Sequence, residues 1–256
     1  MTEIPPTERE DIAPVVPAQG SRGFLLFLRD LLVIVVIAVV ASFLIKTFLV
    51  RSFYIPSESM QQTLQIDDRI LVNELVPKII PLERGDVVVF KDPGGWLSPT
   101  AEVPPSNPLA ASLRWFLDVT GLAPADSNDH LIKRVIGLPG DTVACCDALG
   151  QMSVNGVPLD ESAYVFLPPE VITVSDQPFE VTVPADSLWV MGDNRYNSCD
   201  SRCNTGKPGG GFVPIENLVG RAFVVTWPAS RWAWLDSYRV VFNGTDPVDA
   251  PVGTGG

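Results

Sequence analysis

The chain has 256 residues, enough for one large globular domain or two small ones, and 46% of them are hydrophobic, which suits a buried core. The formal net charge of −12 and the pI of about 4.4 argue against the basic face that nucleic-acid binding requires, so no nucleic-acid partner is expected. The 24 prolines and 20 glycines favour a turn-rich β structure.

The chain begins with a polar, proline-rich stretch, and we predict a disordered tail over 1–23. Residues 24–50 then form one apolar segment, within which 31–45 has a single polar residue, Ser42. Those 15 residues would cover about 22 Å as a helix, so the flanking apolar residues are needed to cross a hydrocarbon core of roughly 30 Å. We therefore predict an N-terminal transmembrane helix over 24–50.

A cleavable export signal is the alternative interpretation of this apolar segment. Val39 and Ala41 satisfy the small-residue pattern at −3 and −1 of a cleavage site. Cleavage there would leave the apolar stub SFLIKTFLV, and the preceding tail is long and acidic, so this alternative is disfavoured. Basic residues are balanced on the two sides of the segment, and the positive-inside rule therefore does not settle its orientation.

Beyond residue 51 the sequence changes to short apolar runs separated by turn residues, a pattern typical of β-strands. The runs predicted to be strands are 69–75, 86–90, 130–137, 179–183, 188–191 and 219–227. The dipeptide Asn155-Gly156 between two valines predicts a two-residue type I′ hairpin. We predict a mainly β protein, in which the helix is followed by a domain of antiparallel β-sheet over 51–242.

One stretch interrupts this pattern. Residues 92–129 are rich in Pro, Ser, Ala and Asn and are predicted to be a variable inserted subdomain. Within it, Asn107 is a suitable N-cap and Gly121 a suitable terminator for a short helix. Residues 243–256 are predicted to be a flexible tail.

The residues that could carry chemistry are few. The only histidine, His130, starts a predicted strand, where a lone histidine is more often structural. Alternate residues of a strand share a face, so Lys133 lies in the apolar row of Leu131 and Val135. Such a lysine either extends to an edge or is desolvated. If it is desolvated, a fall in its pKa of about three units, equivalent to about 4 kcal/mol, would let the amine accept a proton from a serine hydroxyl.

Several segments carry a family resemblance when they are taken in order. They are PSESM followed by Thr63-Leu64, RGDVVVF, KRVIGLPGD, GDNRYNSCDSR, GFVP and VGRA. In this order, after an apolar helix, they resemble type I signal peptidases (leader peptidases), a family of serine-lysine peptidases. The resemblance covers 53–228, and KRVIGLPGD and GDNRYNSCDSR are its most specific parts.

The resemblance implies a membrane-anchored serine endopeptidase that removes signal (leader) peptides from exported proteins with a Ser-Lys dyad. Ser59 would be the nucleophile and Lys133 its general base. The Ser57 hydroxyl would join the Ser59 backbone N–H in the oxyanion hole, and Ser198 would hydrogen-bond and orient the lysine amine. The mainly β domain over 51–242 would then be the catalytic domain.

Supporting and substrate-contacting residues follow from the same resemblance. The charged residues implied to brace the site are Asp193, Asp200, Arg134 and Arg202, with Arg134 and Asp193 as a possible ion pair. Shallow clefts for small side chains at −1 and −3 of an extended peptide would be lined by Phe53, Ile55, Pro56, Met60, Leu64 and Ile132. The stretch CNTGKPGGG after Arg202 is longer and more flexible than is usual for the family.

The implied partners are signal peptides of exported preproteins and membrane lipid, with no metal and no cofactor. The implied location is the bacterial cytoplasmic membrane, crossed once, with the tail over 1–23 in the cytoplasm and the catalytic domain on the extracytoplasmic side. The four cysteines permit three disulfide connectivities. In an exported domain we expect at least one bridge, either Cys199–Cys203 or a link from Cys145 or Cys146 to that loop, and zinc is a weaker alternative.

Two further hypotheses compete with this interpretation. A self-cleaving serine-lysine peptidase of the repressor type is opposed by the apolar anchor and by the lack of a DNA-binding segment. A membrane-anchored, non-enzymatic β-domain for binding or scaffolding requires the placement of Ser59 and Lys133 to be coincidental.

Overall fold

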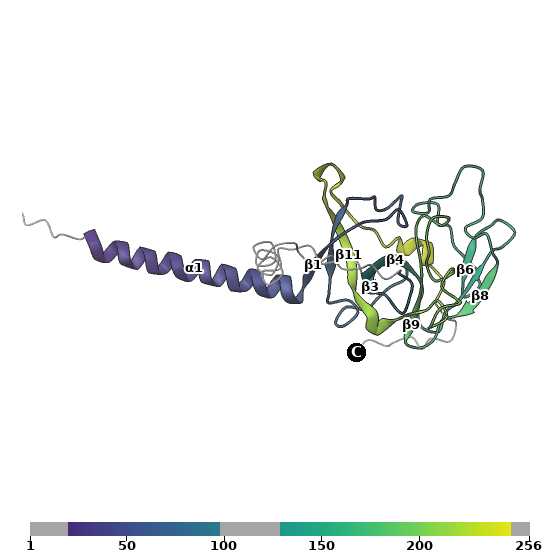
Figure 1. Ribbon diagram of the computed structural model, residues 1–256, viewed down its shortest axis with the longest axis horizontal. Helices are drawn as coiled ribbons and strands as arrows, with labels where there is room; N and C mark the ends of the chain where they lie inside the picture. The colour runs from purple at the N-terminus through teal and green to yellow at the C-terminus, as the bar shows by residue number, and fades with distance from the viewer. Residues whose placement is uncertain (1–19, 98–128, 247–256) are drawn as a thin grey trace, which may run out of the picture. The chain divides into compact units, whose positions relative to one another are not determined.

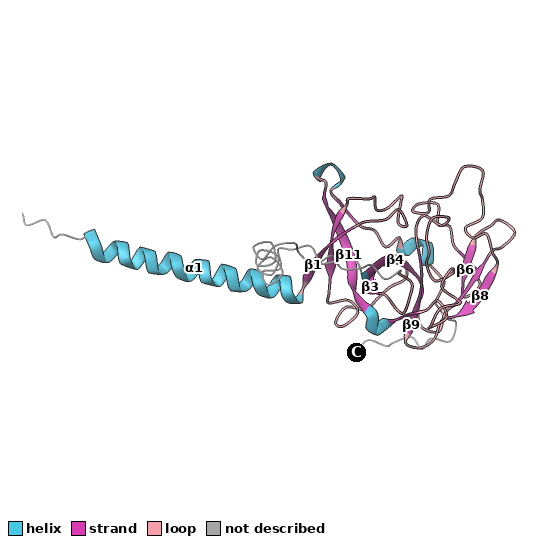
Figure 2. Cartoon of the chain, viewed as in Figure 1, coloured by secondary structure: helices cyan, strands magenta, loops and turns pink. Residues whose placement is uncertain are grey.

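The computed structural model describes the backbone over 20–97 and 129–246, and the side chains in those ranges except at 20–22, 25 and 42–48. The chain divides into two compact units, Met1–Ser42 and Phe43–Gly256. Every described strand, drawn in magenta in Figure 2, lies in the second unit, and the pairings between these strands are antiparallel. The predicted mainly β, antiparallel architecture is confirmed.

Helix α1 (Gly20–Phe48) has 29 residues, beginning inside the predicted tail and ending just before the predicted limit of 50. Its described apolar side chains, from Phe24 to Val40, are exposed. Among the helices that the structure describes, none is long and apolar enough to cross a membrane. The prediction of a transmembrane helix over 24–50 is therefore not supported by the described residues, and it depends in part on 42–48, whose side chains lie outside them.

The larger sheet has the strand order β1-β2-β11-β3-β4-β9-β10, with β12 paired to β11. Its strands are β1 (Val50–Tyr54), β2 (Arg69–Asn73), β3 (Val87–Lys91), β4 (His130–Gly137), β9 (Ser187–Met191), β10 (Val213–Pro214), β11 (Leu218–Trp227) and β12 (Ala233–Trp234). All six predicted strand runs are present, with ends that shift by at most two residues. Strand β4, which carries Lys133, pairs with β3 on one side and with β9 on the other.

The smaller sheet has the order β7-β6-β5-β8, and Figure 1 shows β6 and β8 to the right of β9. Its strands are β5 (Thr142–Cys145), β6 (Met152–Val154), β7 (Val157–Pro158) and β8 (Phe179–Thr182). The Asn155-Gly156 hairpin is confirmed: Val154 pairs with Val157, and both turn residues have positive φ, 51° and 79°. That combination defines a type I′ turn, which asparagine and glycine tolerate best.

Three hydrophobic clusters hold the second unit together. One contains Phe53 of β1 with Met60 and Leu64 of the β1–β2 connection, and a second contains Leu131 and Val135 of β4. The third joins the smaller sheet to the β9 region. Short 3₁₀ helices follow in the C-terminal part: η2 (Ile215–Asn217), η3 (Ala229–Arg231) and η4 (Arg239–Phe242).

Two predicted segments need comment. Most of the insertion over 92–129, including the helix predicted between Asn107 and Gly121, lies outside the described residues. The predicted boundary of the C-terminal tail at 243 is wrong, because Thr245 is fully buried and its carbonyl accepts a hydrogen bond of 2.6 Å from Asn155 Nδ2. The packed domain therefore extends at least to Thr245.

Candidate active site

Ser59 lies in a tight turn of the connection between β1 and β2. The backbone N–H of Leu64 donates to the carbonyl of Met60 at 2.8 Å, and both of these side chains are buried in the core. The turn is fixed from the other side by the Asn194 N–H, which donates to the Ser59 carbonyl at 3.1 Å. Packing of its neighbours therefore holds the Ser59 backbone, while the side chain remains partly accessible.

Lys133 lies on β4, in the apolar row that the strand periodicity predicts. Leu131 and Val135, two residues away on either side, belong to one hydrophobic cluster, and Lys133 itself is only 4% exposed. Its Nζ donates to Ser59 Oγ at 2.7 Å and to the Ile132 carbonyl at 2.9 Å. The tertiary structure thus joins residues 74 positions apart in a direct lysine–serine hydrogen bond.

The environment of Lys133 disfavours its charged form. Burial lowers the pKa of the amine from its ordinary value of 10.5 to about 8, although the charges of Asp200 and Asp193 act in the opposite direction. Desolvation therefore outweighs the attraction of the two carboxylates. Near neutral pH a usable fraction of the amine is uncharged and can accept a proton.

Ser57 lies beside the nucleophile candidate. The Ser57 and Ser59 hydroxyl oxygens are 3.4 Å apart, and Ser57 is exposed. A hydroxyl in this position and the Ser59 backbone N–H come from the same turn. Together they offer two hydrogen-bond donors to an oxygen bound above Ser59.

Ser198 departs from its expected contact. The lysine amine donates to the Ile132 carbonyl, and Ser198 Oγ is buried without a hydrogen-bond partner among the described residues. The hydroxyl is nevertheless close to the site, because a Cβ added at Gly192 would meet Ser198 Oγ at 2.2 Å and the Ser59 carbonyl at 2.4 Å. Gly192 opens the segment GDNRYNSCDSR, but a single glycine in a sequence does not reveal such a close approach.

Asp200 is fully buried behind the site. Its carboxylate accepts from Arg202 Nη2 at 2.8 Å, from Arg202 Nε at 3.0 Å and from the Gly192 N–H at 3.0 Å. Burial alone would raise the pKa of this carboxyl, but Arg202, the Gly192 N–H and the charge of Lys133 hold it below its ordinary value. Asp200 is therefore a fixed negative charge facing the lysine.

Arg134 and Asp193 form a second buried pair on the other side of β4. Two parallel hydrogen bonds of 2.8 Å join the guanidinium to the carboxylate, and both side chains are fully buried. The Arg134 guanidinium also lies 4.2 Å from the centre of the Tyr164 ring and 5.3 Å from that of Tyr238. The same carboxylate accepts a hydrogen bond from Thr63, which ties the pair to the nucleophile turn.

The residues expected to line the substrate clefts divide into two groups. Those at most 2% exposed, and thus part of the core, are Phe53, Ile55, Met60 and Leu64. Pro56 is exposed and Ile132 is partly buried, so these two side chains are accessible near the serine and lysine. Sequence alternation alone did not separate the accessible group from the buried one.

His130 lies at the start of β4. Its Nδ1 is 2.5 Å from Asp129 Oδ1, and its ring packs against Phe53 at a centroid distance of 5.2 Å. The nitrogen that hydrogen-bonds Ser59 is that of Lys133.

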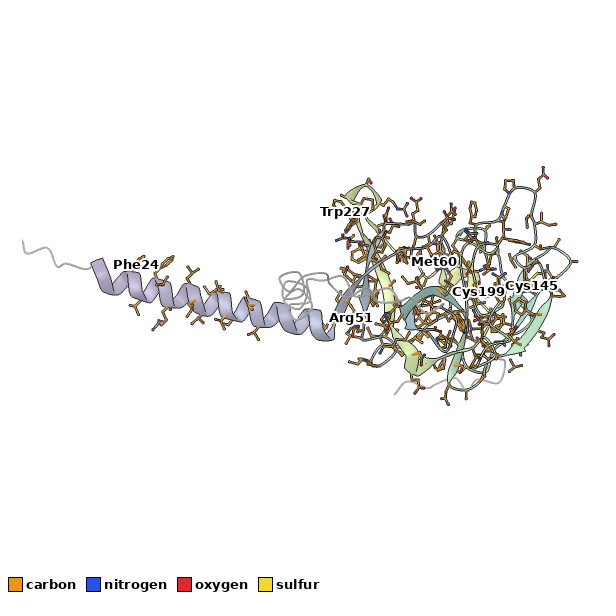
Figure 3. The ribbon with its side chains drawn as sticks, in the orientation of Figure 1. Phe24, Arg51, Met60, Cys145, Cys199 and Trp227 are labelled. Carbon is orange, nitrogen blue, oxygen red and sulfur yellow. A yellow bond between two sulfur atoms is a disulfide. The ribbon has the colours of Figure 1, made fainter. Side chains whose placement is uncertain are left out.

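The four cysteines form two disulfides, Cys145–Cys146 and Cys199–Cys203, with Cys145 and Cys199 labelled in Figure 3. The second agrees with one of the pairings expected from the sequence, whereas the bridge between the adjacent cysteines differs from the expected link to the 199–203 loop. Within the described ranges, no three His, Cys, Asp or Glu side chains are grouped so that they could hold a metal ion.

The geometry suits acyl transfer. A hydroxyl nucleophile, a base of lowered pKa within hydrogen-bond distance, and donors for a developing oxyanion are the groups that this reaction needs. The base here is an amine and the carboxylates lie behind it, so the arrangement differs from a Ser-His-Asp triad.

The chain is similar in sequence to proteins of one known family. Residues 28–227 match the family described as signal peptidase, peptidase S26. A probable signal peptidase I of Mycobacterium leprae is 38% identical over 82% of this chain and 80% of its own, and a signal peptidase I of Mycobacterium tuberculosis is 39% identical over 80% of this chain and 74% of its own. A crystal structure of a signal peptidase I from Enterococcus faecalis V583 is 26% identical, covers 55% of this chain and 95% of its own, and has a TM-score of 0.34.

Proposed function

Because the chain belongs to the signal peptidase family, peptidase S26, we propose that it removes signal peptides from exported preproteins, with Ser59 as nucleophile and Lys133 as general base. It is a serine endopeptidase of that family. The hydrogen bond of 2.7 Å between Lys133 Nζ and Ser59 Oγ is the observation that carries the assignment of the dyad.

The reaction begins with the neutral amine of Lys133. Nζ takes the hydroxyl proton as Ser59 Oγ attacks the scissile carbonyl carbon, and the ammonium then gives that proton to the leaving amine as the peptide C–N bond breaks. An acyl-enzyme on Ser59 remains. Water deprotonated by the same amine attacks the ester, which releases the carboxyl product and restores the serine hydroxyl.

The neighbouring residues support these steps. The Ser57 hydroxyl and the Ser59 N–H stabilise the oxyanion, as their common turn and the separation of 3.4 Å between the two hydroxyl oxygens suggest. Asp200 and Asp193 face the ammonium that forms in the transition state and favour it electrostatically. Their own partners, Arg202 and Arg134, hold the two carboxylates in place.

The substrate surface is smaller than the sequence suggested. We expect an extended peptide to contact Pro56 and Ile132, which are accessible, while Phe53, Met60 and Leu64 shape that surface from beneath. Ser198 holds its place beside Gly192 and Ser59 without donating to the amine in the unliganded site.

The remaining part of the proposal concerns location. An anchor over 24–50 in the bacterial cytoplasmic membrane is supported by its apolar sequence and by the exposure of its apolar side chains on all described faces of α1. Two disulfides favour an oxidising environment for the catalytic domain, and hence the extracytoplasmic side. Recovery of the full chain in the soluble fraction after cell lysis would contradict the anchor.

The test is cleavage of a signal-peptide-bearing preprotein by the full chain in detergent or vesicles. Ser59→Ala and Lys133→Ala are each expected to lower kcat/KM by a factor of about 10³ or more, because each removes a group that acts directly on the reacting atoms. Ser162→Ala and Lys91→Ala, which alter exposed residues of the same types, are the matched controls. Cleavage that survives Lys133→Ala would refute the dyad, and undiminished cellular function of both site variants would favour a non-enzymatic β-domain.

A further inference from the structure

The Cys199–Cys203 disulfide closes a short turn immediately behind the lysine–serine pair. We propose that this disulfide is a positioning element of the active site: it holds the turn over 198–204 in the arrangement that keeps water from Lys133, so that its reduction switches the peptidase to a slow form. The inference rests on the proposed role of Lys133 as general base.

The residue enclosed by the bridge makes the closest link to the site. Asp200 lies between the two cysteines and is fully buried, and its carboxylate accepts from the Gly192 N–H at 3.0 Å. Gly192 in turn has the Ser59 carbonyl and Ser198 Oγ so close that no side chain fits there. A movement of the turn by about 1 Å would therefore shift the packing around the Ser59 backbone and change the distance between the Asp200 carboxylate and the Lys133 amine.

The inside of the turn is filled by one polar side chain. Asn204 is 1% exposed, and its Nδ2 donates to the Asp200 carbonyl at 2.8 Å and lies 3.3 Å from Cys203 Sγ and 3.5 Å from Cys199 Sγ. Ser201 fastens the turn to β9 by exchanging hydrogen bonds of 2.9 and 3.2 Å with the backbone of Val190. Disulfide, amide and hydroxyl thus form one connected support.

Beyond the bridge the backbone is held by local turn hydrogen bonds, such as that of 2.9 Å from the Lys207 N–H to the Asn204 carbonyl. Residues 205–209 are exposed, and Gly209, Gly210 and Gly211 all have positive φ. Glycine-rich backbone is conformationally free once it is released. Both bridged cysteines are themselves exposed, so a reductant in solution can reach the sulfurs.

Reduction is a simple two-electron reaction. Dithiothreitol supplies two electrons and two protons, the Sγ–Sγ bond breaks, Cys199 and Cys203 become thiols, and the reagent closes to its cyclic disulfide. The Cys145–Cys146 bridge reacts in the same way, but it lies in the smaller sheet, at the end of β5. The chain therefore carries its own control disulfide.

The expected effect on Lys133 has a definite sign. The charged groups facing its amine are Asp200 and Asp193, and burial is the larger influence on its pKa. Loosening the turn hydrates the amine and raises its pKa, while retreat of Asp200 lowers the pKa by a smaller amount. The net change is upward, and a rise of about one unit would leave about one tenth as much neutral lysine at pH 7.

The experiment compares two double variants of the full chain, Cys199→Ala with Cys203→Ala and Cys145→Ala with Cys146→Ala, in the preprotein assay across pH. For the Cys199→Ala, Cys203→Ala variant we expect kcat at pH 7 to fall about tenfold, with KM changed by less than about twofold. In the pH profile of kcat/KM, the apparent pKa of the rising limb, near 8 in the wild type, should increase by about one unit. Activity should approach that of the wild type above pH 10. The second double variant should keep the wild-type profile.

Reduction of the wild type provides the same comparison without a substitution, which matters if the first variant does not fold. Dithiothreitol should reproduce its slow form, air oxidation should restore activity, and alkylation followed by mass spectrometry should locate the reduced pair. An unchanged profile, a rate lowered equally at every pH, or equal losses from both disulfides would overturn the proposal. These outcomes are distinct from retention of activity in Lys133→Ala, which would refute the dyad itself.

Discussion

Lys133 and Arg134 are neighbours on β4 and both are buried, but their surroundings shift the two pKa values in opposite directions. Arg134 forms two hydrogen bonds of 2.8 Å with Asp193, whereas the Lys133 amine, among the described residues, hydrogen-bonds to the Ser59 hydroxyl and the Ile132 carbonyl. Burial opposes charge in both cases. Asp193 nevertheless keeps the pKa of Arg134 above its ordinary value, while the pKa of Lys133 falls to about 8.

The contrast shows that burial alone does not make a base. A cation that meets a carboxylate in direct contact remains charged and becomes structural, and a guanidinium cannot be deprotonated under any useful condition. An amine placed among apolar side chains, with carboxylates at longer range, becomes an acid–base group. One strand can therefore supply a structural ion pair and a catalytic base at successive positions.

The largest effect on stability should come from removing one partner of the Arg134–Asp193 ion pair. Arg134→Met leaves the Asp193 carboxylate buried without its partner, so we expect the free energy of unfolding to fall by about 3–5 kcal/mol. Denaturant unfolding of the domain measures this. Arg239→Met, which removes an exposed pairing with Glu83, is the matched control and should change stability by less than about 1 kcal/mol.

A double variant sharpens the same test. Adding Asp193→Leu to Arg134→Met removes the uncompensated charge, and a large part of the lost stability should return. No recovery would mean that the pair acts through packing against Tyr164 and Tyr238 rather than through charge.

Substitution of Lys133 should have the opposite effect on the free energy of unfolding. In the unfolded chain the Lys133 amine titrates near 10.5, and in the folded protein at about 8, so the unfolded state binds more protons between these pH values. Wild-type stability attributable to this group is therefore lowest below pH 8 and rises as pH increases to 10.5. Lys133→Met should raise the free energy of unfolding at pH 7 by about 2–3 kcal/mol, and the gain should vanish above pH 10.5.

Unfolding of Lys133→Met and wild type in parallel at pH 7 and pH 10.5 measures that gain. If Lys133→Met were less stable than the wild type at pH 7, burial of the Lys133 amine would not lower the free energy of unfolding. The proposed contrast with Arg134 would then be wrong.

The smallest effect is expected at the remaining basic side chain of β4. His130 lies beside Asp129 and Phe53, and the base next to Ser59 is Lys133. His130→Ala should therefore change kcat/KM for preprotein cleavage by less than about threefold. A loss comparable to that of Lys133→Ala would revive the histidine as a catalytic group.

Some features followed directly from local sequence. The dipeptide Asn155-Gly156 fixed its hairpin because few residues adopt two successive positive φ angles. Period-two alternation on β4 put Lys133 in the row of Leu131 and Val135. The order of the segments around Ser59 and Lys133 was enough to indicate the family.

Other features depended on long-range contacts that no local pattern contains. Whether Phe53 or Pro56 reaches a substrate depends on which side chains the core encloses, and alternation could not distinguish them. The Ser198 hydroxyl is buried without a hydrogen-bond partner among the described residues, whereas the lysine amine donates to Ser59 and to the Ile132 carbonyl. Gly192 has no room for a side chain because the Ser59 carbonyl and the Ser198 hydroxyl approach its Cα.

By itself, the sequence determined which groups this protein has for chemistry and on which face of a strand its lysine lies, since those depend on residue type and backbone period. Only the tertiary structure decided that the amine meets Ser59, that two carboxylates remain at longer range, and that water is excluded. A pKa reflects the total of solvent and charge around one atom, and that total is assembled from segments distant in the chain.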